Sequence, residues 1–193
     1  MEFNVAEINE LIRSRRSVYP QFYTDQVIER EIIEQILENA NWAPTHRITQ
    51  PWQFCVFTGK GLEKLADFQA NLYKELSGDN FDKKKYDKLI EKPLQCSHVI
   101  SIGVKKTNKV PEIEDIEAVA CAVQNMYLTA RAYGIGAYWG SGGVTYKKEA
   151  NQFFNLGEGD TLVGFFFMGY PIDGEFPKGF RKPITDKIDW IEE

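Results

Sequence analysis

The chain has 193 residues, of which 43% are hydrophobic and 26% are charged, with a net charge of −5. This length and balance predict one globular domain, residues 1–193, that buries a core of its own. The acidic charge argues against nucleic acid as a partner, and no apolar run approaches the roughly 20 residues that a membrane-spanning helix needs.

The rare residue types indicate the compartment and exclude one class of site. Cys55, Cys96 and Cys121 are scattered, and an odd number of such cysteines predicts the reducing cytoplasm. The charged N-terminus is not that of a signal peptide. Two histidines, His46 and His98, are too few for a histidine-rich metal site. Adjacent strand residues point to opposite faces, so a structural role is predicted for the run 96–98.

Apolar periodicity predicts three helices and one strand in the first half of the chain. Asn4 and Glu7 have the spacing of a capping box at the start of the first helix. We expect helices over about residues 4–15, 28–41 and 62–76, and a strand over 53–58. The charged stretch 77–96 is expected to form a solvated helix or a lid.

The second half alternates strands with helices. We expect strands over 98–104, 137–139 and 161–170, and helices over about 111–133 and 145–154. The long helix is rich in alanine, which permits close helix packing, so it is a candidate for the centre of the core or of a dimer interface. The tail 176–190 is too apolar to be free and must dock somewhere. No linker divides these elements, which favours one layered domain.

The usual catalytic signatures are missing. Three glycines at 134, 136 and 140 follow a helix and lack the spacing of a dinucleotide-binding loop. No Walker A sequence is present, and Trp139 stands where a G-x-S-x-G elbow around Ser141 would need glycine. An enzyme without such a site takes its chemistry from a cofactor.

Two basic groups could hold a phosphate. Arg15, Arg16 and Ser17 end the first predicted helix, where two guanidiniums and a hydroxyl could make charge-assisted hydrogen bonds. The alternative is that the arginines complement the helix dipole. Arg181 and Lys182 form a late basic pair, with a solvated tail as the alternative.

Two loops have the composition of site walls. The loop WAPTHRITQPW (42–52) sets polar side chains between proline turns and two tryptophans, and such loops often line sites. Core packing for Trp52 and a surface position for His46 are the alternatives. In WGSGG (139–143), glycines would let the backbone approach a flat ligand, although a flexible turn explains them equally well.

The order of these segments resembles the nitroreductase family. The chain carries, in this order, an early R-R-S, an A-P-T-H-x-x-x-Q-P-W, a W-G-S-G-G and a late R-K-P. The resemblance covers residues 7–190. It implies an α+β fold, a three-layer α-β-α sandwich with a mixed central sheet, in an intertwined homodimer with FMN at the interface.

The resemblance also implies roles for individual residues. Arg15, Arg16, Ser17 and Arg181 would hold the phosphate and ribityl end of FMN, and Gly140, Ser141 and Gly142 would lie along its isoalloxazine. Trp42, Pro44, Thr45 and His46 would approach the flavin, some of them from the partner subunit. NADH or NADPH would pass a hydride through FMN to a small acceptor, such as a nitroaromatic or a quinone, in a ping-pong scheme.

One loop departs from the family pattern. Many family members carry small serines and an asparagine where this chain has Thr45, His46 and Ile48, which puts the substrate in doubt more than the cofactor. A positive charge near the carbonyl end of the flavin is expected, with Arg47 as a candidate. The alternatives are an FMN enzyme of the same fold with different chemistry, such as a dehalogenase, dehydrogenase or oxidase, and a non-catalytic dimer without flavin.

Overall fold

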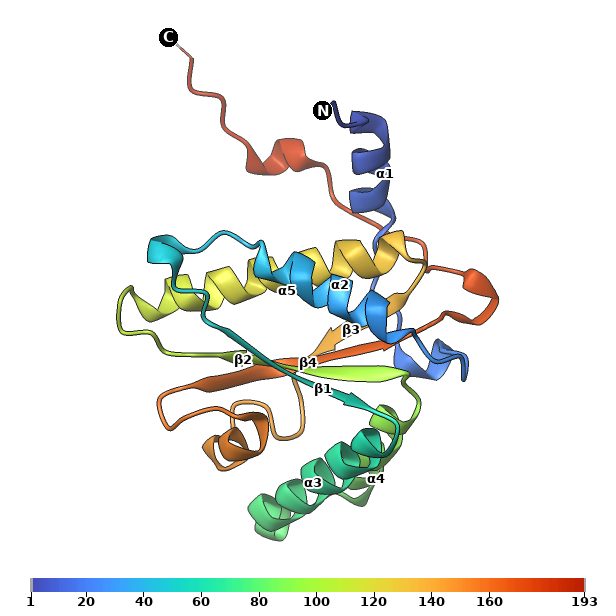
Figure 1. Cartoon of the computed structure of the whole chain (residues 1–193), viewed down its shortest axis with the longest axis vertical. Coiled ribbons are helices and arrows are strands. Elements are labelled where there is room, and N and C mark those ends of the chain that lie inside the picture. The colour runs from blue at the N-terminus through green and yellow to red at the C-terminus, as the bar shows by residue number, and fades with distance from the viewer. Residues whose placement is uncertain (1, 193) are drawn as a thin grey trace.

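The computed structural model describes residues 2–192 and contains a four-stranded sheet between two helical layers (Figure 1). The helices are α1 (Val5–Ser14), α2 (Arg30–Asn41), α3 (Lys60–Ser77), α4 (Lys83–Leu94) and α5 (Glu112–Ala132). The strands are β1 (Trp52–Thr58), β2 (His98–Val104), β3 (Gly136–Gly140) and β4 (Thr161–Gly169). The α+β class is therefore confirmed.

The sheet has the strand order β1-β2-β4-β3, and all neighbouring strands in it run antiparallel. A parallel contribution comes from one isolated bridge, between Ser17 and Ala137 of β3. The predicted mixed sheet is thus almost wholly antiparallel in the described chain. The physical reason is that each connection between strands returns the chain to the sheet running opposite to the strand it pairs with.

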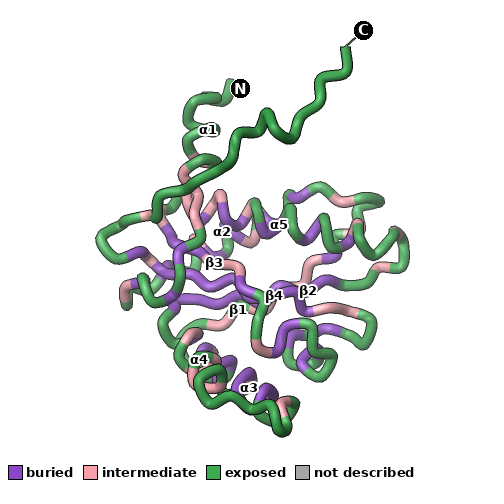
Figure 2. The backbone as a smooth tube through the Cα atoms, turned by 180° about the vertical axis from the view of Figure 1, so that it is seen from behind, coloured by how far each residue is buried: buried purple, intermediate pink, exposed green. Residues whose placement is uncertain are grey.

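Helices α2 and α5 cover one face of the sheet, and α3 and α4 cover the other (Figure 1). Every residue of β2 is buried because helices cover both of its faces. Figure 2 shows the buried residues concentrated in the strands and on the helix faces toward them. Each face has its own apolar core, one with Ile36 and Met126 and the other with Leu65 and Phe165.

Most predicted elements are present within a few residues of their expected ends. The Asn4 side chain accepts hydrogen bonds from the N–H groups of Ala6 and Glu7, as its capping role requires. The helix predicted over 145–154 was wrong in form, because only a 3-10 helix, Lys148–Phe154, is present. Tyr146 before it has a positive φ of 65°, which an α-helix does not allow.

The terminal segments are not covered by the rest of the chain. Helix α1 has no buried residue, and it leaves the main body on the same side as the C-terminal tail (Figure 1). In the tail, Phe180 is 80% exposed and Trp190 is 81% exposed. Phe176 packs against the core, but the docking predicted for the rest of the tail is not made within one chain. None of the helices among residues 2–192 is long and apolar enough to cross a bilayer.

Candidate functional site

The R-R-S segment is held against the edge of the sheet. Arg15 caps the C-terminus of α1, and its N–H donates to the Leu11 carbonyl. Two residues later the chain bridges Ala137, and the Val18 N–H donates to the Ala137 carbonyl at 2.9 Å. The arginines therefore lie at the point where α1 joins edge strand β3.

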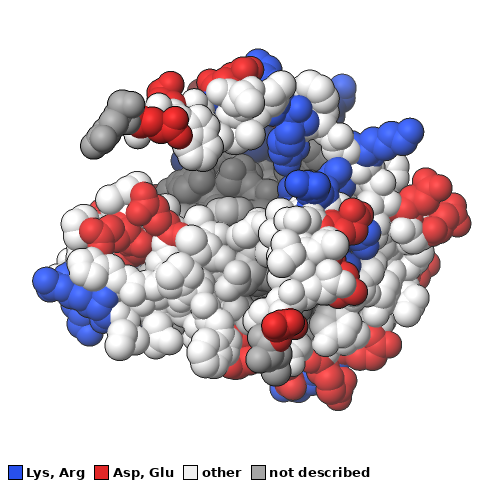
Figure 3. Space-filling view, turned by 90° about the horizontal axis from the view of Figure 1, so that it is seen from above, with Lys and Arg blue, Asp and Glu red and all other residues white. Residues whose placement is uncertain are grey.

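The structure brings three of the predicted cofactor-binding residues together. Arg15, Arg16 and Arg181 line one cavity of about 480 Å³ beside Gln124 of α5. The other lining residues are Ile12, Arg13, Gly179 and Phe180. Figure 3 shows this end of the molecule hollowed between the terminal segments and the body, with Lys and Arg side chains gathered at one rim. No carboxylate lines the cavity, so its charge is strongly positive.

Arg16 has a hydrogen-bond donor without a partner. Its Nη1 donates to the carbonyls of Arg13 at 2.5 Å and Arg15 at 2.6 Å. Its Nε is buried and has no partner among the described residues. A Cβ at Gly179 would lie 2.2 Å from the Arg16 guanidinium carbon, so any other residue there would force the Arg16 side chain to move. A buried, unpaired guanidinium N–H is costly, and an anion in the cavity would satisfy it.

Tyr127 of α5 ties the basic segment to the strand beside it. The Trp139 N–H donates to the Tyr127 hydroxyl at 2.6 Å, and Ser17 Oγ lies 3.4 Å from the same hydroxyl. The Arg15 guanidinium stacks over the Tyr127 ring at 5.0 Å. One buried tyrosine thus positions both Arg15 and Ser17 next to β3.

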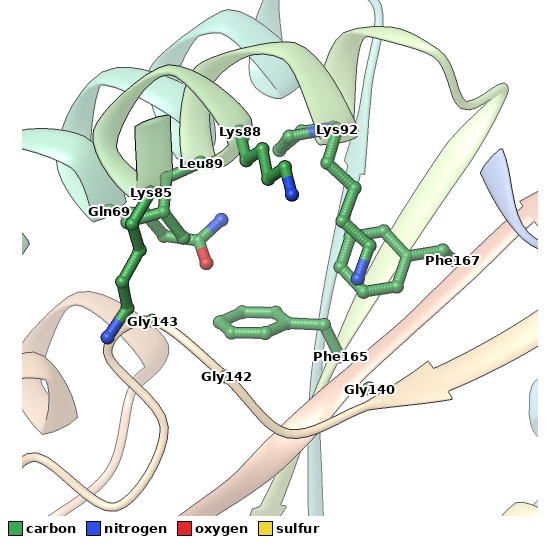
Figure 4. Close-up of a pocket in the computed structure, with 11 residues that line it drawn as sticks. Gln69, Lys85, Lys88, Leu89, Lys92, Gly140, Gly142, Gly143, Phe165 and Phe167 are labelled. Carbon is green, nitrogen blue, oxygen red and sulfur yellow. The ribbon is translucent and has the colours of Figure 1, made fainter. Parts of the chain in front are cut away.

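The glycine segment borders a second cavity, of about 210 Å³, between the sheet and α4 (Figure 4). Gly140 and Gly142 form one side of it, and Lys85, Lys88 and Lys92 line the other. The Lys92 Nζ lies 4.1 Å from the centroid of the Phe167 ring and 4.4 Å from that of Tyr138. Burial lowers the pKa of Lys92 from its ordinary value of 10.5.

The 42–46 loop lies apart from both of these cavities in a single chain. Pro44, Thr45 and His46 line a third cavity of about 440 Å³ against the first turns of α5, where His46 Nδ1 lies 2.6 Å from Glu114 Oε2. Trp42 lines none of these cavities. Its side chain is 77% exposed, and its Nε1 donates to Glu38 at 2.9 Å.

Core packing, the alternative given for Trp52, and the structural role predicted for the run 96–98 both agree with the structure. Trp52 packs against the core and donates to Asn41 Oδ1 at 3.1 Å. Burial raises the pKa of Cys96 to about 12, which makes the thiol unreactive. The Ser97 hydroxyl accepts from the Ile28 N–H at 2.7 Å and lies 2.9 Å from His98 Nδ1, so these side chains connect elements.

Sequence reasoning missed Lys92 and Tyr127. Arg47, the expected second cation, instead donates to the Lys109 carbonyl at 3.2 Å, beside the N-terminal end of α5. The cation that the structure sets next to Gly140 is Lys92, whose Nζ would lie 3.3 Å from a Cβ there. A lysine periodicity of three and four residues in the 77–96 stretch, at Lys85, Lys88 and Lys92, was the available signal.

The fold and the basic cavity define a layered α+β protein with a site suited to a phosphorylated ligand. Comparison with known proteins then gives its family: residues 12–170 match the model of the Nitroreductase family, and the chain belongs to that family. The predicted family and fold are thus confirmed.

Three relatives are particularly similar. A Bacillus subtilis protein provisionally named NAD(P)H nitroreductase YfhC is 30% identical, over 94% of this chain and 92% of its own. A nitroreductase-like protein from Bacillus cereus has a solved structure with a TM-score of 0.83 at 30% identity, covering 100% of both chains. A Desulfovibrio desulfuricans structure, described as a provisional nitroreductase in complex with FMN, has a TM-score of 0.72 at 23% identity. That likeness covers 97% of this chain and 96% of the other, and it supports the fold.

Proposed function

We propose that this protein is an FMN-dependent oxidoreductase that takes a hydride from NADH or NADPH and reduces a small acceptor in a ping-pong scheme. The observation that carries the proposal is the buried, unpartnered Nε of Arg16 in a cavity lined by Arg13, Arg15 and Arg181. The names of relatives agree, since the similar Bacillus subtilis protein is called an NAD(P)H nitroreductase and the similar Desulfovibrio structure contains FMN.

The residues present fit the phosphate end of FMN. Guanidiniums bind phosphate oxygens through paired N–H donors, and this cavity holds several guanidiniums with no competing carboxylate. Arg15, Arg16 and Arg181 would hold the phosphate, and the exposed Ser17 hydroxyl would donate one more hydrogen bond. When bound, FMN supplies two-electron transfer between a reduced nicotinamide and an acceptor.

The glycine segment fits the ring end. Gly142 exposes backbone that a flat ligand can approach, Ser141 precedes it, and the buried Gly140 lines the same cavity. Lys92 holds a positive charge against this segment and would favour negative charge that develops nearby. Trp139 Nε1 is a second buried donor with no partner among the described residues.

We also propose that the working unit is a homodimer, because the proposed site is incomplete in one chain. Pro44, Thr45 and His46 lie toward the N-terminal end of α5, whereas Gln124, further along α5, faces the arginine cavity. At 1.5 Å per residue, Glu114 and Gln124 are about 15 Å apart along the helix. A second copy running antiparallel along α5 would bring its 42–46 loop, including Trp42, to this chain's cavity.

The exposed apolar side chains support such a dimer. Ile113 and Ile116 on α5 are 58% and 37% exposed. The α1 face and the tail expose further large apolar side chains: Phe3, Ile8, Ile12, Phe180, Ile184 and Trp190. Apolar surface on this scale marks an interaction site. A second copy that covers these three elements together would provide the docking expected for the tail.

The deciding experiment is an absorbance spectrum of the purified protein before and after anaerobic addition of NADH or of NADPH. Flavin bands that bleach on addition would support the proposal and identify the donor. Flavin bands that neither nucleotide bleaches would refute NADH and NADPH as the hydride donors. No flavin after reconstitution with FMN would refute the proposal as a whole. Analytical ultracentrifugation on the same sample tests the homodimer, and a monomer would refute that part.

A further inference from the structure

Arg131, in the last turn of α5, contacts both of the segments that close the arginine cavity. Its Nε donates to Ser14 Oγ at 3.1 Å, at the C-terminal end of α1. Its guanidinium carbon lies 4.0 Å from the centroid of the Phe176 ring in the tail. Helix α1 and the tail leave the body side by side, next to this end of α5 (Figure 1). One side chain therefore joins three segments that are far apart in the sequence.

Few other contacts hold α1 and the tail. Helix α1 has no buried residue, and the bond to Ser14 is its only side-chain hydrogen bond to another element among residues 2–192. The tail is held as sparsely, since Phe176 is the only residue of 172–192 that is not exposed. Segments with so few buried contacts open easily. Removal of the Arg131 guanidinium would thus release both segments at once.

The same three segments supply every residue that lines the arginine cavity. The basic pair 15–16 directly follows α1, Gln124 lies on α5, and Arg181 lies in the tail. Positions 124 and 131 are almost two full helical turns apart, so Arg131 shares a face of α5 with Gln124, about 10 Å further along. Arg131 does not itself line the cavity. It can affect a ligand there only through the residues that it holds.

We propose that Arg131 is a positioning residue for the phosphate of FMN, because it holds α1 and the tail against α5 so that the guanidiniums of the cavity are in place before the ligand binds. A tail that had to be ordered on binding would cost affinity, since each residue that is fixed loses conformational entropy. A guanidinium suits this role, because its planar face stacks on an aromatic ring while its edge donates hydrogen bonds. The identity of the ligand rests on the proposed function, whereas the attachment of the two segments does not.

The first measurement is the FMN dissociation constant of the full chain, by fluorescence quenching. We expect Arg131→Met, which keeps the length of the side chain but not its charge or its donors, to raise this constant roughly 5- to 30-fold. Arg131→Lys keeps a cation that can stack on Phe176, so its constant should lie closer to the wild-type value. Arg30→Met is the matched control, because Arg30 is exposed on α2 and lies outside the cavity, and it should leave the constant unchanged.

A double-mutant cycle tests whether Arg131 acts through the tail. In an Arg181→Ala background the tail carries no guanidinium into the cavity, so the loss caused by Arg131→Met should be smaller there by about 3-fold or more. A substitution that only destabilised the fold would weaken FMN binding equally in both backgrounds. That result would overturn the role of Arg131, as would wild-type affinity in Arg131→Met itself.

Trypsin cleavage after Lys178, followed by mass spectrometry, tests the attachment of the tail without FMN. Cleavage should be faster in Arg131→Met than in the wild type at a temperature where both are folded, and an unchanged rate would overturn the role of Arg131. If the wild-type protein binds no FMN, the proposed function fails, and faster cleavage in the variant still supports the attachment. If FMN binds and is bleached by NADH or NADPH while the cleavage rate is unchanged, only the role of Arg131 fails.

Discussion

Replacing Arg15 with alanine tests the phosphate site most directly. The guanidinium stacks 5.0 Å above the Tyr127 ring and lines the cavity with Arg16 and Arg181. A charge-assisted hydrogen bond to a phosphate contributes about 1.5–3 kcal/mol, so Arg15→Ala should raise the FMN dissociation constant roughly 10- to 150-fold. Arg15→Lys keeps the charge but loses the planar guanidinium fork, so its FMN dissociation constant should lie between those of the wild-type protein and of Arg15→Ala.

The assay is fluorescence quenching of FMN titrated with the apoprotein at fixed ionic strength. Arg30→Ala is the matched control, because Arg30 pairs with Glu34 on the exposed side of α2 and does not line the arginine cavity. Thermal unfolding without FMN separates lost binding from lost folding. An unchanged FMN dissociation constant in Arg15→Ala, with the fold intact, would refute the role assigned to Arg15.

Three further predictions concern packing, pH and assembly. Gly164→Ala should lower the free energy of unfolding, measured in urea, by about 2 kcal/mol or more. The reason is that Gly164 has a φ of +147° and that a Cβ there would lie 2.7 Å from the Gly140 carbonyl oxygen. Gly61→Ala is the control: a Cβ at Gly61 lies 3.9 Å from its nearest atom, so this variant should not lower the free energy of unfolding. Burial raises the pKa of Cys96 from 9.0 to about 12, so the unfolded thiol deprotonates first and stability falls as pH rises above 9.0. The loss should reach about 1.4 kcal/mol by pH 10, and a Cys96→Ala variant with the same alkaline slope would contradict this. Ending the chain after Glu175 should give a monomer by ultracentrifugation, and a retained dimer would show that the tail is not needed.

Local chemistry explains why most of the fold could be predicted. Asn4 is a strong N-cap, the buried strand 98–104 is rich in valine and isoleucine, and both are properties of near neighbours in the chain. The direction of strand pairing is not local, because it depends on which edge each crossover returns to. For this reason the predicted mixed sheet proved to be antiparallel except for one bridge at Ser17.

The candidate site divides in the same way. The sequence indicated Arg15, Arg16 and Ser17 through their place in the family's order of motifs, because the two arginines taken alone could also complement the helix dipole. The resemblance also implied that Arg181 joins them, and the structure places Arg181 in one cavity with Arg15 and Arg16. Only the tertiary structure showed that the charged stretch 77–96 forms a wall of lysines facing Gly140. The physical reason is that a side chain's charge and size follow from the residue type alone, whereas its burial and the residues it contacts depend on how distant segments pack.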